Sequence, residues 1–281
     1  MAGTQLISSL VNKHIEGAEP LVEEYLPNLW QEITYNPRQV NKLRIRVLTV
    51  WAAVARALIV RNHPKGEKYT DDVFKLLEDH QIGRDAGKTI GSIALNNDGV
   101  LTKQNHSVVR LFALQKLCSI VLPRVIAGYK ESTDTHLQEA YLVALASLIR
   151  AVPKATYVYM ASTLMPILLR GLSLQDTDLR INIFETLLQV AKDSAETVGV
   201  SGSDPLVEHA GSLVKASLAN SQVSETGNSR VQICALQLLA ALPNTLRYDL
   251  LHPYKAQVIR QLGVVLDDRK RVVRKEAVDC R

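Results

Sequence analysis

The sequence has few of the residues that build disulfide-linked or metal-bound folds. Its three cysteines, Cys118, Cys234 and Cys280, are far apart and odd in number over 281 residues. Each lies in an apolar, helix-like frame, where a free thiol commonly behaves as a small hydrophobic side chain. The histidines include no pair at i and i+4 and no His-Glu-x-x-His stretch, so zinc-protease chemistry has no support. We expect no disulfide, no metal site and no cofactor.

Long hydrophobic runs are also missing. The longest apolar stretch, Val47 to Val60, is interrupted by Arg56 and is shorter than the ~20 residues that a membrane-spanning helix needs. Residues 1–20 contain no sustained apolar core after a basic start, which argues against a cleaved signal peptide. We therefore expect no membrane contact and an intracellular location.

One segment imitates a catalytic motif. Residues 83–89, Gly-Arg-Asp-Ala-Gly-Lys-Thr, resemble a phosphate-binding P-loop, but three residues separate the glycines where the motif needs four. The segment also follows a helical pattern at 73–79, whereas a P-loop follows a strand. Our interpretation is a helix that tolerates glycine. No other arrangement of side chains points to catalysis, so we expect that the protein is not an enzyme.

What the sequence does contain is helical periodicity. The composition is 47% apolar and only 5% aromatic, with little strand-like alternation, which predicts an all-α fold. From Val231, apolar residues recur at i+3, i+4, i+7, i+8 and i+11, the pattern of one buried helical stripe. Similar stripes begin at Leu43 and Leu179.

A helix-start signature, an apolar residue followed by a polar one, recurs along the chain. It occurs at Leu137, Leu179, Val231 and Val273, which are 42, 52 and 42 residues apart. Two-helix HEAT units repeat at roughly 40 to 47 residues. We predict a HEAT-repeat α-solenoid of about six antiparallel helix pairs, with 1–281 forming a single domain. Because the last helix stops in mid-pattern, we expect this domain to be a fragment of a longer solenoid.

The spacing predicts the position of each helix. First helices of the pairs are expected near 20–33, 68–80, 108–130, 155–174, 204–219 and 247–266. Second helices are expected near 38–61, 82–95, 134–151, 177–197, 228–242 and 268–281, with a further helix at 5–17. Prolines in three first helices, at Pro27, Pro123 and Pro166, predict a kink in each.

Positive charge is modest and densest near the C-terminus. The net charge is +5, and the densest basic run is Arg-Lys-Arg at 269–271. Such a run could be a nuclear-import signal or contact phosphate. We favour a structural interpretation, because Asp267, Asp268 and Arg274 lie where HEAT units place an acid in the turn and a base in the second helix. Without interleaved aromatic residues, direct nucleic-acid binding is not expected.

Two segments near the end resemble a known family. Leu-Leu-His-Pro-Tyr-Lys-Ala-Gln-Val-Ile-Arg-Gln-Leu at 250–262 and Leu-Asp-Asp-Arg-Lys-Arg-Val-Val-Arg-Lys-Glu-Ala-Val at 266–278 closely resemble the C-terminal HEAT repeats of the methyl methanesulfonate-sensitivity nineteen family, known in nucleotide excision repair and transcription. Arg-Ala-Val-Pro-Lys at 150–154, ahead of Met-Pro-Ile-Leu-Leu at 165–169, supports the resemblance. It is specific over 105–281 and looser before that range.

This resemblance implies a non-enzymatic adaptor of the cytosolic iron–sulfur cluster targeting complex. The family joins a small α/β assembly factor and a WD-repeat β-propeller protein to iron–sulfur apo-proteins, among them polymerases, primase and helicases. It implies a cytoplasmic and nuclear location, and it implies that the C-terminal repeats hold the small assembly factor. Because iron–sulfur ligation is dominated by cysteine thiolates, the scattered cysteines indicate that this chain does not hold the cluster itself.

An adaptor is expected to present polar or amphipathic residues of its second helices beside the apolar stripe. By spacing, with Arg and Tyr favoured as interface anchors, the candidate partner-binding residues are Lys42, Arg46, Gln138, Tyr141, Asn182, Glu185, Gln189, Gln237 and Lys275. A karyopherin-like transport receptor or a phosphatase scaffold would share the HEAT period. A basic nucleic-acid-binding solenoid is a third alternative, and its affinity would fall steeply with salt.

Overall fold

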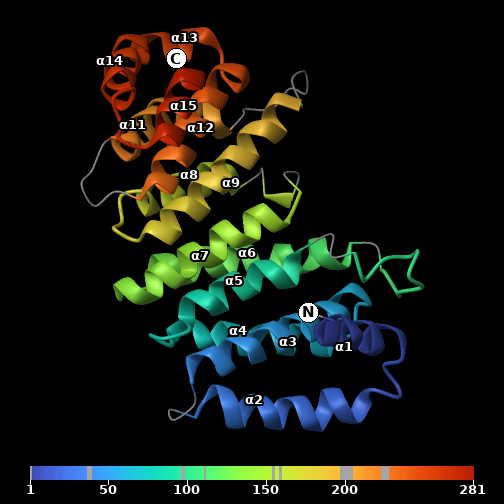
Figure 1. Ribbon diagram of the computed structural model, residues 1–281. Coiled ribbons are helices and arrows are strands. Elements are labelled where there is room, and N and C mark those ends of the chain that lie inside the picture. Colours follow the sequence, from blue (N-terminus) through green and yellow to red (C-terminus); the bar gives the residue numbers. More distant parts are fainter. Residues whose placement is uncertain are drawn as a thin grey trace. The chain divides into compact units, whose positions relative to one another are not determined.

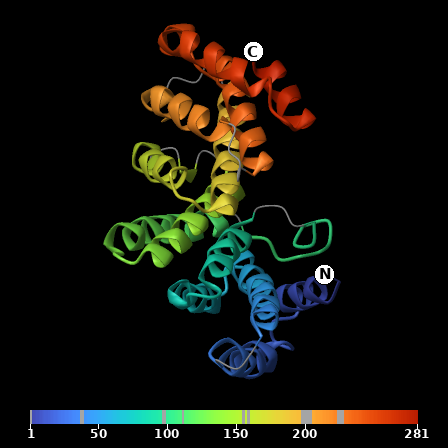
Figure 2. The ribbon, with the colours of Figure 1, turned by 60° about the vertical axis from the view of Figure 1, so that its left-hand side comes forward.

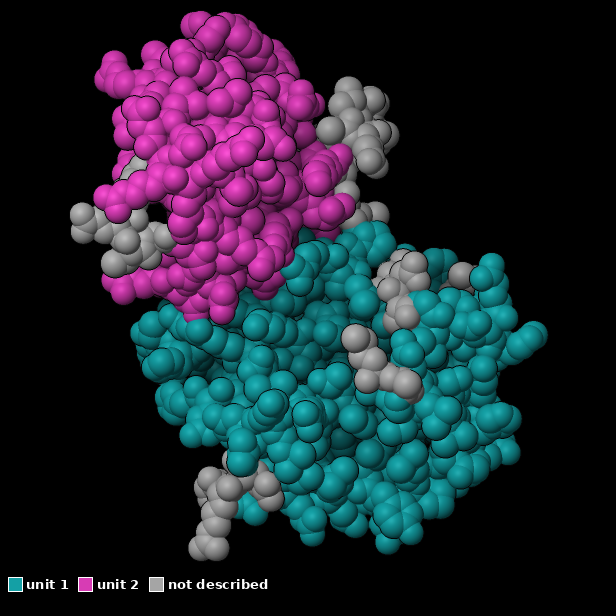
Figure 3. Space-filling view, viewed as in Figure 1, with its two compact units in different colours: residues 1–156 teal, residues 157–281 magenta. Residues whose placement is uncertain are grey.

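The computed structural model describes residues 2–36, 40–95, 99–110, 112–153, 156–157, 160–196, 205–222 and 228–281. Over these ranges the chain is all-α without a strand, which confirms the predicted fold class. No helix in the same ranges is both long and apolar enough to span a bilayer. The chain forms two compact units, Met1–Thr156 and Tyr157–Arg281 (Figure 3). The prediction of one domain over 1–281 depends on how these units join, and it stays a prediction.

Unit 1 (Met1–Thr156) is built from helix pairs. Its first helices are α2 (Leu26–Thr34), α4 (Lys65–Lys75) and α6 (Ala113–Glu131). Its second helices are α3 (Asn41–Val60), α5 (Gly83–Ala94) and α7 (Thr135–Ala151). α3 packs along α5, α5 packs along α7, and α1 (Ala2–Lys13) lies beside α3 (Figures 1 and 2). Each second helix therefore contacts the next, as in a stack of repeats.

Aromatic side chains fill the core of the first pairs. Both tryptophans of the chain, Trp30 on α2 and Trp51 on α3, are buried and stack with their ring centroids 4.2 Å apart. Tyr69 on α4 also stacks with Trp51, at 4.0 Å, and accepts a 2.9 Å hydrogen bond from the indole N–H at its carbonyl oxygen. This stack joins three helices of unit 1.

Unit 2 (Tyr157–Arg281) repeats the arrangement. Its first helices are α8 (Ala161–Gly171), α11 (Ala210–Ser221) and α14 (Lys255–Val265). Its second helices are α9 (Thr177–Glu196), α12 (Ser229–Thr245) and α15 (Arg271–Cys280). α9 packs along α12, and α12 packs along α15.

Two predicted first helices of unit 2 are each divided. The prediction at 204–219 becomes the short α10 (Pro205–Glu208) followed by α11. The prediction at 247–266 becomes α13 (Tyr248–Leu251), a 3₁₀ turn at His252–Tyr254, and α14. The turn contains Pro253, which has no N–H to donate to a continuing helix.

The six second helices of the described ranges begin at residues 41, 83, 135, 177, 229 and 271. Successive starts are therefore 42, 52, 42, 52 and 42 residues apart. The alternation confirms the predicted period and extends it into the first two repeats. The longer intervals contain the connections that follow α5 and α9.

A charged pair links successive second helices in unit 1. Asp79 precedes α5, and its carboxylate accepts hydrogen bonds from the backbone N–H groups of Gln81 and Ile82. The same carboxylate accepts a bond from the buried guanidinium of Arg44 on α3. Partial burial acts to raise the pKa of Asp79, but the hydrogen bonds outweigh it and hold the pKa below its ordinary value. α3 and the start of α5 are thereby joined.

The corresponding link in unit 2 uses a neutral partner. Buried Asp268 accepts a 2.8 Å bond from the backbone N–H of Lys270 at the start of α15 and a 3.4 Å bond from Nε2 of Gln232 on α12. Nη1 of Arg274 donates to the carbonyl oxygen of Asp268 at 2.6 Å. The predicted structural roles of Asp268 and Arg274 are confirmed, whereas Asp267 is exposed.

The prolines of the first helices differ in position. Pro123 and Pro166 lie inside α6 and α8, as predicted. Pro27 instead lies in the first turn of α2, directly after a π-helical turn at Leu21–Tyr25. A further difference is the start of α6, which was predicted at 108 and begins at Ala113. Phe112 adopts a left-handed φ of 64° immediately before it, and this conformation cannot continue a right-handed helix.

The P-loop-like segment 83–89 forms the first half of α5 and is helical, as interpreted. Two glycines of α5, Gly87 within the segment and Gly91 after it, lie against a neighbouring helix. A Cβ at Gly87 would lie 2.6 Å from the carbonyl oxygen of Ala140, and one at Gly91 would lie 2.7 Å from the carbonyl oxygen of Ser147. Both neighbours belong to α7. The glycines are therefore required for the close approach of α5 to α7.

Candidate partner-binding surfaces

Two of the predicted partner-binding residues begin the second helix of the first pair. Lys42 and Arg46 both lie on α3 and are exposed. Arg46 also lines a small cleft of about 120 Å³ together with Leu29 of α2 and Trp51 of α3. The Arg46 side chain therefore borders the seam between α2 and α3, and its exposed guanidinium can reach a ligand there.

Two further predicted residues of unit 1 contact their own repeat. Gln138 is half-buried, and its Nε2 donates to the carbonyl oxygen of Ser132 at 2.6 Å. Tyr141 packs against Gly128 of α6, where an added Cβ would lie 2.3 Å from the ring carbon Cζ. Burial raises the pKa of the Tyr141 hydroxyl, and nearby Arg124 opposes this effect. Both side chains hold α6 against the start of α7.

The remaining predicted residues lie on the second helices of unit 2. Asn182 and Gln237 are half-buried, and Glu185 is half-buried in an ion pair with Nη2 of Arg230 at 3.0 Å. Gln189 on α9 and Lys275 on α15 are exposed. Of the nine candidates, four are therefore exposed, and they are Lys42, Arg46, Gln189 and Lys275. The partner-binding role of all nine stays a prediction.

Unit 2 contains a groove that the sequence analysis did not predict. Its volume is about 270 Å³, and it lies where α13 and α14 meet the C-terminal ends of α12 and α15. Buried leucines form its floor, and these are Leu239, Leu242, Leu246 and Leu262. Exposed side chains form its rim, and these are Tyr248, His252, Lys255, Ile259 and Arg281.

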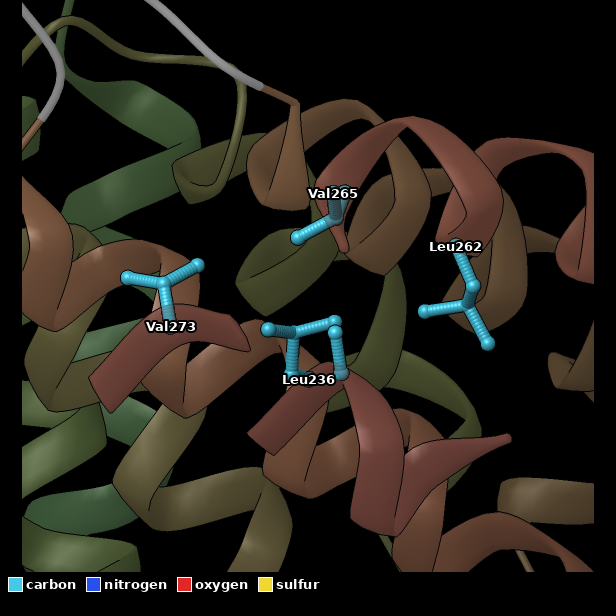
Figure 4. Close-up of a cluster of buried hydrophobic side chains, with 5 residues drawn as sticks. Leu236, Leu262, Val265 and Val273 are labelled. Carbon is cyan, nitrogen blue, oxygen red and sulfur yellow. The ribbon is translucent and has the colours of Figure 1, made fainter. Parts of the chain in front are cut away.

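The floor is continuous with the last hydrophobic core of the chain. Leu262 of α14 packs with Leu236 of α12 and with Val273 of α15 in a fully buried cluster (Figure 4). Cys280 packs against the same cluster and also lines the groove. Burial raises the pKa of the Cys280 thiol to about 11, so this residue is a neutral part of the wall. A well-packed base of this kind keeps the groove in one shape.

The signal for this groove was present in the sequence. Tyr248, His252, Lys255 and Ile259 are spaced by four, three and four residues, which places them along one side of a helical path. The predicted first helix 247–266 thus carries a second amphipathic stripe besides its core stripe. All nine predicted partner-binding residues belong to second helices, so none of them lies on this stripe.

The cysteines are not arranged to hold a metal or a cluster. Cys118 lies on α6 in unit 1, whereas Cys234 and Cys280 lie on α12 and α15 in unit 2. Burial raises the pKa of each thiol, to about 12 for Cys118. In the part of the chain that the structure describes, no three His, Cys, Asp or Glu side chains come close enough to share a metal ion.

A family model described as RNAPII transcription regulator C-terminal matches residues 1–243 of the chain. The chain belongs to this family. The match begins at residue 1, so the likeness extends further toward the N-terminus than the motifs of the last repeats indicated. The model ends before the motifs at 250–262 and 266–278, and the resemblance that they indicated is confirmed by this match together with the relatives that cover the whole chain.

Curated relatives match the whole chain. The MMS19 nucleotide excision repair protein homologs of Xenopus tropicalis and Homo sapiens are 29% and 28% identical to it, and both comparisons cover 100% of this chain. The DNA repair/transcription protein mms19 of Schizosaccharomyces pombe is 27% identical over 99% of the chain. The chain spans 26% of the length of each of these relatives.

Solved structures support the fold alone. Two engineered proteins of known crystal structure superpose on the chain with TM-scores of 0.57 and 0.55. They cover 91% and 92% of this chain, and the chain covers 96% and 94% of theirs, at 18% and 17% identity.

Proposed function

We propose that this chain is a non-catalytic binding scaffold that acts in DNA repair and transcription. The relatives named for these processes align with it from end to end, over the part of their length that it spans. Stacked helix pairs supply a long surface with exposed polar residues on successive second helices, which suits an adaptor. The observation that carries the proposal is the packing of successive second helices combined with similarity to those relatives over the whole length of this chain.

The finer proposal is an adaptor of the cytosolic iron–sulfur cluster targeting complex. In it the chain binds a small α/β assembly factor, works beside a WD-repeat β-propeller protein, and helps deliver clusters to polymerases, primase and helicases in the cytoplasm and nucleus. The cluster is cargo in this role, which fits three free thiols, two buried and one half-buried, that are spread over two units. An adaptor needs no catalytic group.

The test is a pull-down of the folded chain with the purified small assembly factor, followed by light scattering of the complex. Charge reversal of the exposed candidates then locates the contact: Lys42→Glu with Arg46→Glu in unit 1, and Lys275→Glu in unit 2. We expect one of these variants to weaken binding by about tenfold, the loss typical of an interface anchor. The matched control is Lys103→Glu, an exposed cation outside the second helices, which should bind as the unchanged chain does.

Absence of a complex with a chain that is helical by circular dichroism would contradict the finer proposal. Binding to a small GTPase or to a phosphatase catalytic subunit would then favour a transport receptor or a phosphatase scaffold. Affinity for an oligonucleotide that falls steeply with salt would favour a nucleic-acid-binding solenoid.

A further inference from the structure

The unit 2 groove is small, and this limits the size of the group that can bind in it. Its volume of about 270 Å³ lies just below the ~300 to 1,000 Å³ that small-molecule sites occupy. Its floor consists of leucine side chains, and Tyr248 and Ile259 on the rim are 66% and 41% exposed. A site of this size and polarity suits one or two apolar side chains presented by a polypeptide.

The charged side chains that line the groove are basic. Lys255 and Arg281 lie on the rim, and no acidic residue lines the groove. Neither cation forms a salt bridge within the described ranges of the chain. Residues 247–281 contain nine Lys or Arg and five Asp or Glu, so they carry a net +4 of the chain's +5. An incoming segment with carboxylates beside its apolar side chains would be complementary to this rim.

From this complementarity, we propose that the groove binds an acidic amphipathic helix of a partner protein. Aliphatic side chains on one face of that helix would rest on the half-buried Leu251 and Val258 and against the exposed Ile259. Carboxylates on its flanks would pair with Lys255 and Arg281. The inference rests on the proposed function only in that the chain works by binding proteins, and it does not depend on which partner provides the helix.

The observations favour a polypeptide over a nucleic acid. Phosphate contacts would use the cations but would leave the leucine floor unused, and buried apolar area is the main source of affinity in a groove of this kind. The imidazole of His252 lies 5.1 Å from the Tyr248 ring, centroid to centroid, so the two rings together extend the apolar wall at one end. An acidic amphipathic helix would contact both the apolar floor and the basic side chains of the rim.

The probe is a fluorescein-labelled helical peptide of about four turns, with leucines at i and i+4 and glutamates on the flanks. Binding to the full chain is followed by fluorescence anisotropy at low and moderate salt. Two matched peptides replace the glutamates by lysine or the leucines by serine. We expect the acidic, leucine-bearing peptide to bind at least about tenfold more tightly than either control.

Variants of the chain assign the binding to the groove. Ile259→Asp should weaken binding of the acidic peptide by about tenfold, because it places a carboxylate beside the apolar floor. Lys255→Glu should weaken it about threefold to tenfold and reduce its salt dependence. The matched control is Val264→Asp, because Val264 is on the same helix, is 63% exposed and does not line the groove. It should leave binding unchanged.

Several results would overturn the inference. These are equal binding of the acidic and basic peptides, an equal loss in Ile259→Asp and Val264→Asp, or full displacement of the peptide by single-stranded oligonucleotide. Loss of peptide binding with the small assembly factor still bound would refute the groove and leave the proposed function standing. The reverse result would support the groove and refute the finer function.

Discussion

The contact between α5 and α7 in unit 1 and the groove beside α14 in unit 2 differ in how closely neighbouring helices approach each other. In unit 1, Gly87 and Gly91 remove the side chains at the contact, so the helix backbones meet and no space remains. In unit 2, α13 and α14 meet the ends of α12 and α15 through leucines and other large side chains, and a groove of about 270 Å³ lies there. Side-chain size at a few positions thus decides whether a seam between repeats is closed or can receive a ligand.

The largest effect is expected from a larger side chain in the close contact between α5 and α7. Gly91→Val should lower the free energy of unfolding of unit 1 by about 3 kcal/mol, because a Cβ there already lies 2.6 Å from the Ser147 Cβ and two more carbons must be accommodated. Urea unfolding followed by tryptophan fluorescence measures this effect in unit 1 alone, since Trp30 and Trp51 both belong to it.

The matched control is Gly263→Val on α14, where an added Cβ meets nothing within 4 Å. Because α14 belongs to unit 2, unfolding of this variant is followed by circular dichroism. We expect a change below about 0.5 kcal/mol for this variant. Similar losses in both variants would show that the close approach of α5 to α7 does not account for the result.

Removing the Asp79 carboxylate leaves a buried charge without its carboxylate partner, whereas removing the Asp268 carboxylate leaves only a neutral amide without one. Asp79→Ala should cost unit 1 about 2 kcal/mol, because it leaves the guanidinium of Arg44 buried without its carboxylate. Asp268→Ala should cost unit 2 about 1 kcal/mol, the usual value of a helix cap, because Gln232 is neutral. Urea titrations read by fluorescence for unit 1 and by circular dichroism for the whole chain compare the two. Equal costs would show that the Arg44 pair adds nothing.

The Asp79 link also predicts a dependence on pH. Since the folded-state pKa of Asp79 is lowered, its contribution is complete above the ordinary value of 3.8 and is lost as pH falls through the folded-state pKa. Fluorescence-detected unfolding of unit 1 should therefore show a smaller acid-induced loss of stability in Asp79→Asn than in the unchanged chain. An identical pH dependence of the two proteins would contradict this assignment.

The smallest expected effect is a gain in the stability of unit 2. Gly263→Ala should raise the stability of unit 2 by about 0.8 kcal/mol, because alanine is the better helix former and open space surrounds the position. Hydrogen exchange of peptides from α14 provides the measurement. Slower exchange is the expected result, and faster exchange would show a contact that an added methyl group disturbs.

Second helices could be predicted closely because their determinants are local. The apolar stripe from Val231 and the cap at Asn228, whose side chain accepts the N–H of Arg230, together set the start of α12 at Ser229. The same reasoning predicted 134–151 for a helix that spans Thr135–Ala151. Local patterns of this kind do not depend on the rest of the fold.

The parts that could not be predicted depend on distant or unusual conformations. The role of Gly91 requires knowing that Ser147, 56 residues later, lies against it. The late start of α6 follows from the left-handed Phe112, a conformation that is rare for a residue with a side chain. Spacing placed Gln138 and Tyr141 beside the stripe, but it could not show that α6 already contacts them.

The alternation of 42- and 52-residue intervals has a consequence for how such a chain can be shortened or extended. The smallest segment that restores both kinds of connection is a pair of repeats, 94 residues long. Removing or duplicating 94 residues brings together the same types of junction that the chain already uses, whereas removing a single repeat places two connections of the same length in succession. The natural module of this array, for inheritance or for engineering, is thus a tandem of four principal helices.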